Sequence, residues 1–359
     1  MRPIHLTFLP LLIALAASPA RSEWTELTIP TNENPRSLWF TNASTGFMAG
    51  ISVWRTDDGA ATWKKVEVPS VTYYEIRFRD ALTGFIAGNG SLLKTMDGGN
   101  QWQPIGQVSQ SFQKLAVSGE VVYGMTSGGR RLWKSANGGL AWDSLGDMGT
   151  IIKHMAFPDS QSGFFSNQTD LYKTSDGGKQ WRKVYSLRLG GLLTDLQFLN
   201  PDTGYAVAYY PGSILSTYDG GETWKEVAAK YWLYGMHFSD ARHGCVVGNS
   251  LGEVLRTTDA GATWIPEGTA GPGNFRDVHF PVADVGYILG STALLKFSNA
   301  STSIRPLGRL IRSGKGSSRI FDIRGALLSP GRRAAHRPVI LRLVPYTSWP
   351  SGRAKDISE

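Results

Sequence analysis

One eight-residue segment recurs six times along the chain, at intervals of about 40 residues. Each copy begins with Thr or Ser, has Asp or Asn at its third position and ends in Trp. Successive final tryptophans are 39, 40, 39, 43 and 40 residues apart: Trp63, Trp102, Trp142, Trp181, Trp224 and Trp264. A fixed period of a few tens of residues indicates a repeat architecture, in which each supersecondary unit packs on the next. This repeat constrains the fold more strongly than any other feature.

The recurring segment has the chemistry of a tight turn between two strands. A short Asp side chain accepts hydrogen bonds from backbone amides of its own turn, and Gly supplies positive φ. The Trp ring covers the apolar stem of the hairpin. Asn137 replaces the Asp in the third copy and Ala60 replaces a Gly in the first. We assign a structural role to the tryptophans above and to Asp58, Asp97, Asn137, Asp176, Asp219 and Asp259.

A unit of about 40 residues accommodates four short strands, which is the size of one β-propeller blade. In the second unit we expect an inner strand at 74–79, a second strand at 84–88 and an outer pair at 91–95 and 102–105. The composition, with 42 Gly, 12 Trp and 18% charged residues, also favours strands and turns over helices.

The blade count comes from six complete units and one divided unit. Residues 275–299 supply three strands of a seventh blade, with a degenerate turn segment at 297–301 that lacks Trp. The segment Trp24–Pro30 mirrors Trp63–Pro69 and supplies the missing outer strand, which closes the ring and removes exposed sheet edges. The predicted fold is an all-β, seven-bladed propeller over 23–300, with six or eight blades as the alternatives.

The repeated segments resemble Asp-box (BNR) repeats. The whole unit, illustrated by Ile76–Asp80, Thr83–Gly88 and Leu93–Trp102, resembles the photosystem II stability/assembly factor family. This resemblance covers about 23–300. It implies an exported or lumenal seven-bladed propeller that holds a protein or peptide partner without catalysing a reaction.

Asp-box propellers also include sialidases, so an enzymatic alternative needs consideration. The early Arg-Ile-Pro motif of sialidases has no counterpart, because the nearest string, Ile76-Arg77-Phe78, falls on a recurring blade position. Other units hold Trp39, Ala156, Gln197, His237 and His279 there. No nucleotide-binding loop or metalloprotease motif is present in the sequence. We expect no catalytic residues, and the alternative is a glycan-binding or glycan-hydrolysing propeller of the sialidase superfamily.

A binding site in this architecture is expected where the inner strands open into the central channel. The starts of the inner strands carry mixed charges and two tyrosines, which suit a polar peptide or a glycan, although an ordinary solvated rim has the same composition. His237 and His279 are too few ligands for a metal, and no cofactor is expected. The candidate residues at the channel mouth are Arg36, Tyr74, Glu75, Lys153, His154, Asp195, Tyr234, Arg276 and Asp277.

Residues 1–22 are predicted to be a secretory signal peptide. Arg2 provides a positive start, 4–17 is apolar, and Ala20-Arg21-Ser22 offers small residues for cleavage before Glu23. An uncleaved anchor is the alternative. No later stretch is long and apolar enough for a membrane helix. The single cysteine, Cys245, excludes an intrachain disulfide and a cysteine-based zinc site. We expect the protein in the periplasm, on the cell surface or secreted.

The basic character of the chain comes from its end. Residues 301–359 contain 12 Lys and Arg against 3 Asp and Glu, whereas 23–300 contain 23 basic and 26 acidic residues. The propeller therefore lacks the charge expected of a nucleic-acid-binding surface. The segment 319–343 resembles the C-terminal sorting domain of type IX secreted proteins, but Ala326 and Pro338 depart from that pattern. A disordered basic tail is the alternative.

Overall fold

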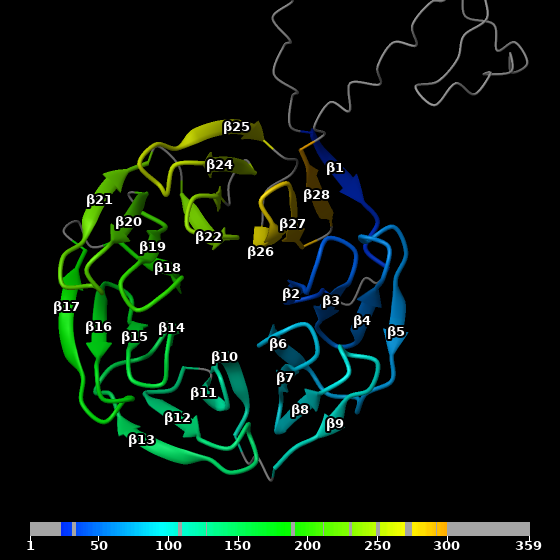
Figure 1. Ribbon diagram of the computed structural model, residues 1–359, viewed down its shortest axis with the longest axis horizontal. Coiled ribbons are helices and arrows are strands. Elements are labelled where there is room, and N and C mark those ends of the chain that lie inside the picture. Colours follow the sequence, from blue (N-terminus) through cyan, green and yellow to red (C-terminus); the bar gives the residue numbers. More distant parts are fainter. Residues whose placement is uncertain are drawn as a thin grey trace, which may run out of the picture. The chain divides into compact units, whose positions relative to one another are not determined.

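The computed structural model describes residues 23–299, apart from short gaps at 31–33, 107–109, 127, 188–190, 211, 230–231, 249–251, 270–274 and 292. The predicted signal peptide and the basic segment 301–359 lie outside the described residues. Within the described part, the strands form seven antiparallel, four-stranded sheets that succeed one another around a central axis (Figure 1). The predicted seven-bladed propeller is confirmed, and the six- and eight-bladed alternatives are wrong.

Each of the first six blades consists of four consecutive strands, the first innermost. Blades 1 to 3 comprise β2 (Ser37–Phe40), β3 (Gly46–Ala49), β4 (Val53–Thr56), β5 (Lys64–Val66); β6 (Tyr73–Phe78), β7 (Gly84–Gly88), β8 (Ser91–Thr95), β9 (Gln103–Pro104); and β10 (Phe112–Ser118), β11 (Val121–Thr126), β12 (Arg131–Ser135), β13 (Asp143–Asp147). Blades 4 to 6 comprise β14 (His154–Ala156), β15 (Gly163–Ser166), β16 (Asp170–Thr174), β17 (Arg182–Ser186); β18 (Leu193–Phe198), β19 (Gly204–Ala208), β20 (Ser213–Thr217), β21 (Lys225–Ala228); and β22 (Leu233–Phe238), β23 (Gly244–Gly248), β24 (Glu253–Thr257), β25 (Ile265–Thr269).

Blade 7 is assembled from both ends of the ring. It contains β26 (Phe275–Val282), β27 (Val285–Gly290) and β28 (Leu294–Ser298), and its outer strand is β1 (Glu23–Leu27), which pairs antiparallel with β28 (Figure 1). Trp24 packs against Phe280 and Phe297, with ring centroids 6.3 and 5.2 Å apart. The predicted closure by the N-terminal strand is confirmed.

The predicted strand bounds in the second unit are close to those observed. The second and third strands match β7 and β8, and the inner strand β6 begins and ends one residue earlier than expected. The outer strand is shorter than 102–105, since β9 contains only Gln103 and Pro104. Pro104 has no N–H to donate to a ladder, which limits the pairing with β8.

The Asp-box turns are held by a repeated set of hydrogen bonds. In blade 2, the Thr95 hydroxyl donates to Asp97 Oδ1 at 2.8 Å and accepts the Gly99 N–H at 2.8 Å, while Gln101 N–H donates to Asp97 Oδ1 at 3.0 Å. Asn137 Oδ1 accepts the equivalent bonds in blade 3. In blade 5, hydrogen bonds from the Thr223 hydroxyl and N–H lower the pKa of Asp219 to about 2. An amide oxygen can therefore replace the carboxylate in this turn.

Aromatic side chains fill the space between neighbouring blades. Phe47 of blade 1 stacks on Phe78 of blade 2, with centroids 5.0 Å apart, and Tyr123 stacks on Phe157 at 3.4 Å between blades 3 and 4. Lys134 lies over the Tyr123 ring at 5.4 Å and donates to the Gly177 carbonyl of the next Asp-box at 3.2 Å. The same link closes the ring, because Lys296 of blade 7 donates to the Gly59 carbonyl of blade 1 at 2.9 Å.

Candidate binding site at the channel mouth

The inner strands of all seven blades begin on one face of the ring, and we call the opening on this face the channel mouth. Five inner strands carry a β-bulge near their start, seen as a register shift in the pairing with the second strand. A bulge leaves one residue unpaired and re-aims its side chain. The unpaired residues are Tyr74, Gln113, Thr194, Tyr234 and Arg276.

The residue that follows the bulge, or that occupies the same place in the register of blades 1 and 4, has a repeated role, and we call this place the linking position. In four blades its side chain accepts a hydrogen bond from a backbone N–H of the next blade. Ile76 N–H donates to Ser37 Oγ at 3.3 Å, Leu115 to Glu75 Oε2 at 3.2 Å, Met236 to Asp195 Oδ2 at 3.0 Å and Leu38 to Asp277 Oδ2 at 2.8 Å. These links join inner strands that share no sheet.

Two residues further on, a second set of side chains links blades 5, 6, 7 and 1. Gln197 Oε1 accepts the Phe238 N–H at 2.8 Å, and His237 and His279 accept through Nδ1 from Phe280 and Phe40 at 3.2 and 3.3 Å. The acceptor is thus an amide oxygen in one blade and an imidazole nitrogen in two. Burial and the nearby Arg77 guanidinium lower the pKa of His237 to about 3.

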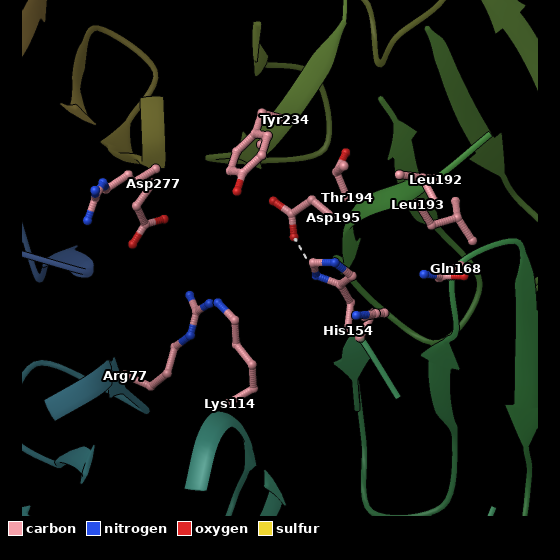
Figure 2. Close-up of a pocket in the computed structure, with 13 residues that line it drawn as sticks. Arg77, Lys114, His154, Gln168, Leu192, Leu193, Thr194, Asp195, Tyr234 and Asp277 are labelled. Carbon is pink, nitrogen blue, oxygen red and sulfur yellow. Dashed lines mark ion pairs between the residues drawn. The ribbon is translucent and has the colours of Figure 1, made fainter. Parts of the chain in front are cut away.

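At the other three linking positions, the side chain accepts no backbone N–H from the next blade among the described residues. Lys114 and Gly235 have no acceptor atom in their side chains, and His154 accepts no backbone N–H from blade 5 among the described residues. All three instead line a cavity of about 400 Å³ at the channel mouth, shown in Figure 2.

Six of the nine residues predicted for this site line the cavity: Lys153, His154, Asp195, Tyr234, Arg276 and Asp277. The other three do not. Arg36 lies over the Tyr74 ring at 5.5 Å between blades 1 and 2, and Glu75 is fully buried, where it serves blade linking and ion pairing.

Two cations that sequence reasoning left out of the site also line the cavity. Arg77 was assigned to the repeat architecture, but its guanidinium turns back to the Glu75 carboxylate at 2.6 Å and reaches the cavity. The Lys114 ammonium lies 3.7 Å from Glu75, and Figure 2 shows the ends of Arg77 and Lys114 next to each other. The available sequence signal was that charge occurs at the Arg77 position in one blade only.

Burial and neighbouring charges shift the pKa values of the ionisable groups around the cavity. Burial disfavours the charged form of Arg77, but Glu75, Asp277 and Asp195 outweigh this effect and raise its pKa. Burial raises the pKa of Asp277, against the influence of Arg77 and Lys114. Burial lowers the pKa of His154 to about 4 although Asp195 lies 4.0 Å away, so His154 is neutral at pH 7. The cavity therefore combines fixed cations, carboxylates and a neutral imidazole.

The described residues contain no cluster of three or more His, Cys, Asp or Glu side chains that could hold a metal ion. No helix long and apolar enough to cross a membrane occurs in the part of the chain that the structure covers. The single cysteine, Cys245, is buried in β23, where burial raises the pKa of its thiol.

Comparison with known sequences relates this chain to photosystem II assembly factors. Residues 16–145 match the family model described as photosynthesis system II assembly factor YCF48. The chain is similar to the photosystem II assembly lipoprotein Ycf48 of Synechococcus sp. (strain CC9902), with 26% identity over 212 residues, which is 57% of this chain. The match spans only about half (52%) of that curated relative.

Solved structures with the same fold include proteins of different activities. A structure of YCF48 bound to a D1 peptide aligns with a TM-score of 0.63 and 20% identity, over 79% of this chain and 98% of that one. Virginiamycin B lyase from Staphylococcus aureus aligns with a TM-score of 0.65 and 7% identity, over 77% of this chain and 99% of the lyase. Both likenesses concern the fold, which is shared by a binding protein and an enzyme. The chain is therefore a seven-bladed β-propeller that is similar in sequence to YCF48 over part of its length.

Proposed function

We propose that the chain is an exported, non-catalytic propeller that binds an extended segment of a partner protein at the channel mouth. The observation that carries this proposal is the cavity of about 400 Å³, which is large enough for a few peptide residues and lined by cations from four blades. The YCF48 structure with a bound D1 peptide supports it, because it shows that a propeller of this fold can take a peptide ligand.

The charge arrangement favours an acidic group in the bound segment. Among the described residues, no carboxylate lies within ion-pair distance of Lys153 or Arg276, whereas the Asp195 and Asp277 carboxylates already accept backbone N–H groups. The cations are thus available to a ligand and the carboxylates are partly occupied. A carboxylate of the partner, from Asp, Glu or a chain terminus, satisfies Lys153 and Arg276 with charge-assisted hydrogen bonds.

The test is selection of peptides by the full chain from a random library displayed with free C-termini. We expect enrichment of acidic sequences, and loss of that enrichment when Lys153 and Arg276 are both changed to Glu. The matched control changes Lys64 and Lys65 to Glu, which alters the charge equally on the exposed outer strand β5. No enrichment, or equal enrichment by both variants, refutes the proposal.

The glycan alternative is tested with the same proteins on a glycan array and in an assay for released sugar. Binding or hydrolysis of a glycan in the absence of peptide selection assigns the chain to the sialidase-like alternative. Export is tested by sequencing the N-terminus of the protein recovered from cells, and we expect it to begin near Glu23.

A further inference from the structure

Apolar side chains gather on one side of the channel mouth, over blades 5 and 6. Leu192, Tyr210, Trp232 and Tyr234 are exposed by 42, 58, 44 and 41%, respectively. Tyr209 packs against one of them, with its ring centroid 5.3 Å from that of Trp232. We call these five residues the aromatic edge. Solvent-exposed aromatics grouped in this way are typical of interaction surfaces.

Hydrogen bonds within blade 5 and between blades 5 and 6 hold the aromatic edge in place. The Tyr209 N–H donates to the Leu192 carbonyl at 2.7 Å, which fixes the loop after β19 on the start of the inner strand β18. The Thr194 hydroxyl donates to the Leu233 carbonyl of blade 6 at 3.1 Å. The bulge at Tyr234 aims this ring toward the channel (Figure 2). The edge is therefore organised before a ligand arrives, which reduces the entropy lost on binding.

The aromatic edge continues into the cavity. Leu192 and Tyr234 line both, and in Figure 2 Arg77 and Lys114 lie across the cavity from Tyr234. The other two cations, Lys153 and Arg276, come from blades 4 and 7, on either side of blades 5 and 6. The mouth thus has an apolar part over blades 5 and 6, with cations both beside it and across the cavity from it, and a ligand that satisfies both must carry an apolar group next to an acidic one.

We infer that the bound segment carries an aromatic or large aliphatic side chain beside its acidic group, and that the aromatic edge binds this side chain. The inference rests on the proposed function and adds the chemistry that selects the partner. The acidic group pairs with the cations, while the apolar side chain packs on Tyr210, Trp232 and Tyr234. Tyr and Trp contribute large contact areas with little loss of side-chain entropy, so they determine specificity at such sites.

The experiment uses the same library of displayed peptides and compares the wild-type full chain with three variants. In the test variant, Tyr210, Trp232 and Tyr234 are changed to Ser. In the control, the exposed Leu82 and Leu140, which lie in turns on the opposite face of the ring, are changed to Ser. A second test variant, Tyr210→Ser alone, guards against misfolding because this ring is the most exposed of the three. Thermal unfolding verifies that each form is folded.

Wild type and control are expected to enrich peptides in which an aromatic or aliphatic residue neighbours an acidic one. The triple variant is expected to retain the acidic preference and to lose the apolar one, with at least a tenfold weaker Kd for a labelled peptide taken from the wild-type selection. Tyr210→Ser is expected to weaken it severalfold.

The outcomes separate this inference from the proposed function. Acidic peptides without an apolar preference in the wild-type selection overturn the inference and leave the proposed function standing. An unchanged apolar preference in both folded edge variants also overturns it. Absence of any peptide enrichment refutes the proposed function, and glycan binding that is lost in the edge variants assigns the aromatic edge to sugar stacking.

Discussion

Two histidines in the channel join neighbouring blades through a nitrogen that must stay unprotonated. His237 Nδ1 accepts the Phe280 N–H at 3.2 Å, and His279 Nδ1 accepts the Phe40 N–H at 3.3 Å. A backbone N–H can only donate, so protonation of Nδ1 replaces an attraction by a repulsion. Burial and the Arg77 guanidinium lower the pKa of His237 to about 3, and burial, His237 and Arg77 hold that of His279 well below its ordinary value.

The direction of the pH effect follows from these shifts. In the unfolded chain the histidines take up protons below their ordinary pKa of 6.5, whereas the folded protein resists protonation until the pH approaches 3. Stability is therefore complete above pH 6.5 and falls as the pH decreases toward 3. For His237 with its ring shielded from water, the free energy of unfolding at pH 5 is about 2 kcal/mol lower than above pH 6.5. Contact of the ring with channel water reduces this loss to about 1–2 kcal/mol.

The repeat itself supplies the substitution that tests this reasoning. Gln197 occupies the same position in blade 5 and accepts the Phe238 N–H at 2.8 Å through an atom that does not titrate. His237→Gln is expected to change the free energy of unfolding by less than about 1 kcal/mol at pH 7.5. Between pH 7.5 and pH 5, the free energy of unfolding of this variant should fall by about 1–2 kcal/mol less than that of wild type.

Urea unfolding of the full chain, followed by tryptophan fluorescence at both pH values, measures these free energies. His237→Phe is the control, because it removes the acceptor at every pH and should be destabilised at both. An equal loss of stability between pH 7.5 and pH 5 in wild type and His237→Gln refutes the argument. Destabilisation of His237→Gln at pH 7.5 as large as that of His237→Phe shows that glutamine does not reproduce the bond.

Three further predictions concern the blades and their closure. Thr95→Val removes a buried hydroxyl that holds the Asp-box turn and should cost about 1–2 kcal/mol in urea unfolding, whereas Thr95→Ser, the residue type that Ser135 provides in blade 3, should cost less than half as much. Gly99→Ala should cost about 2–4 kcal/mol, because φ is +80° there and a Cβ would lie 2.4 Å from the Phe47 ring; a loss below 1 kcal/mol contradicts this. Trp24→Ala should release β1 from β28 and produce concentration-dependent self-association in size-exclusion chromatography, and an unchanged monomeric elution profile counts against the closure role.

The sequence was sufficient for the fold because the repeat determines the blade and the blade count determines the ring. The match between Trp24–Pro30 and Trp63–Pro69 was sufficient for the closure, which the β1–β28 pairing confirms. The site was harder to predict from the sequence, because β-bulges shift the register of the inner strands by one residue. Alternation along a strand does not reveal which side chains a bulge turns into the channel.

The errors at individual residues have the same physical origin. Glu75 begins an inner strand and was expected at the mouth, but the Leu115 N–H of the next blade offers it a buried hydrogen bond. Arg77 occupies a position that is neutral in the other blades, yet its long side chain turns back to Glu75 and into the cavity. Both outcomes depend on the backbone and charges of a neighbouring blade, which a pattern within one repeat does not contain.

Departures from the repeat at the linking position nevertheless coincide with the candidate binding site. Ser37 and Glu75 keep the structural role and do not line the cavity, whereas Asp195 and Asp277 keep it and also line the cavity. Lys114, His154 and Gly235 occupy the linking position without accepting this hydrogen bond, and all three line the cavity. Blades 3, 4 and 6 thus each lack one hydrogen bond to the next blade, and the cavity has a cation, an imidazole and an opening in their place. Because residues of blades 3, 4 and 6 line the cavity, a ligand that binds the folded ring there should stabilise it against unfolding.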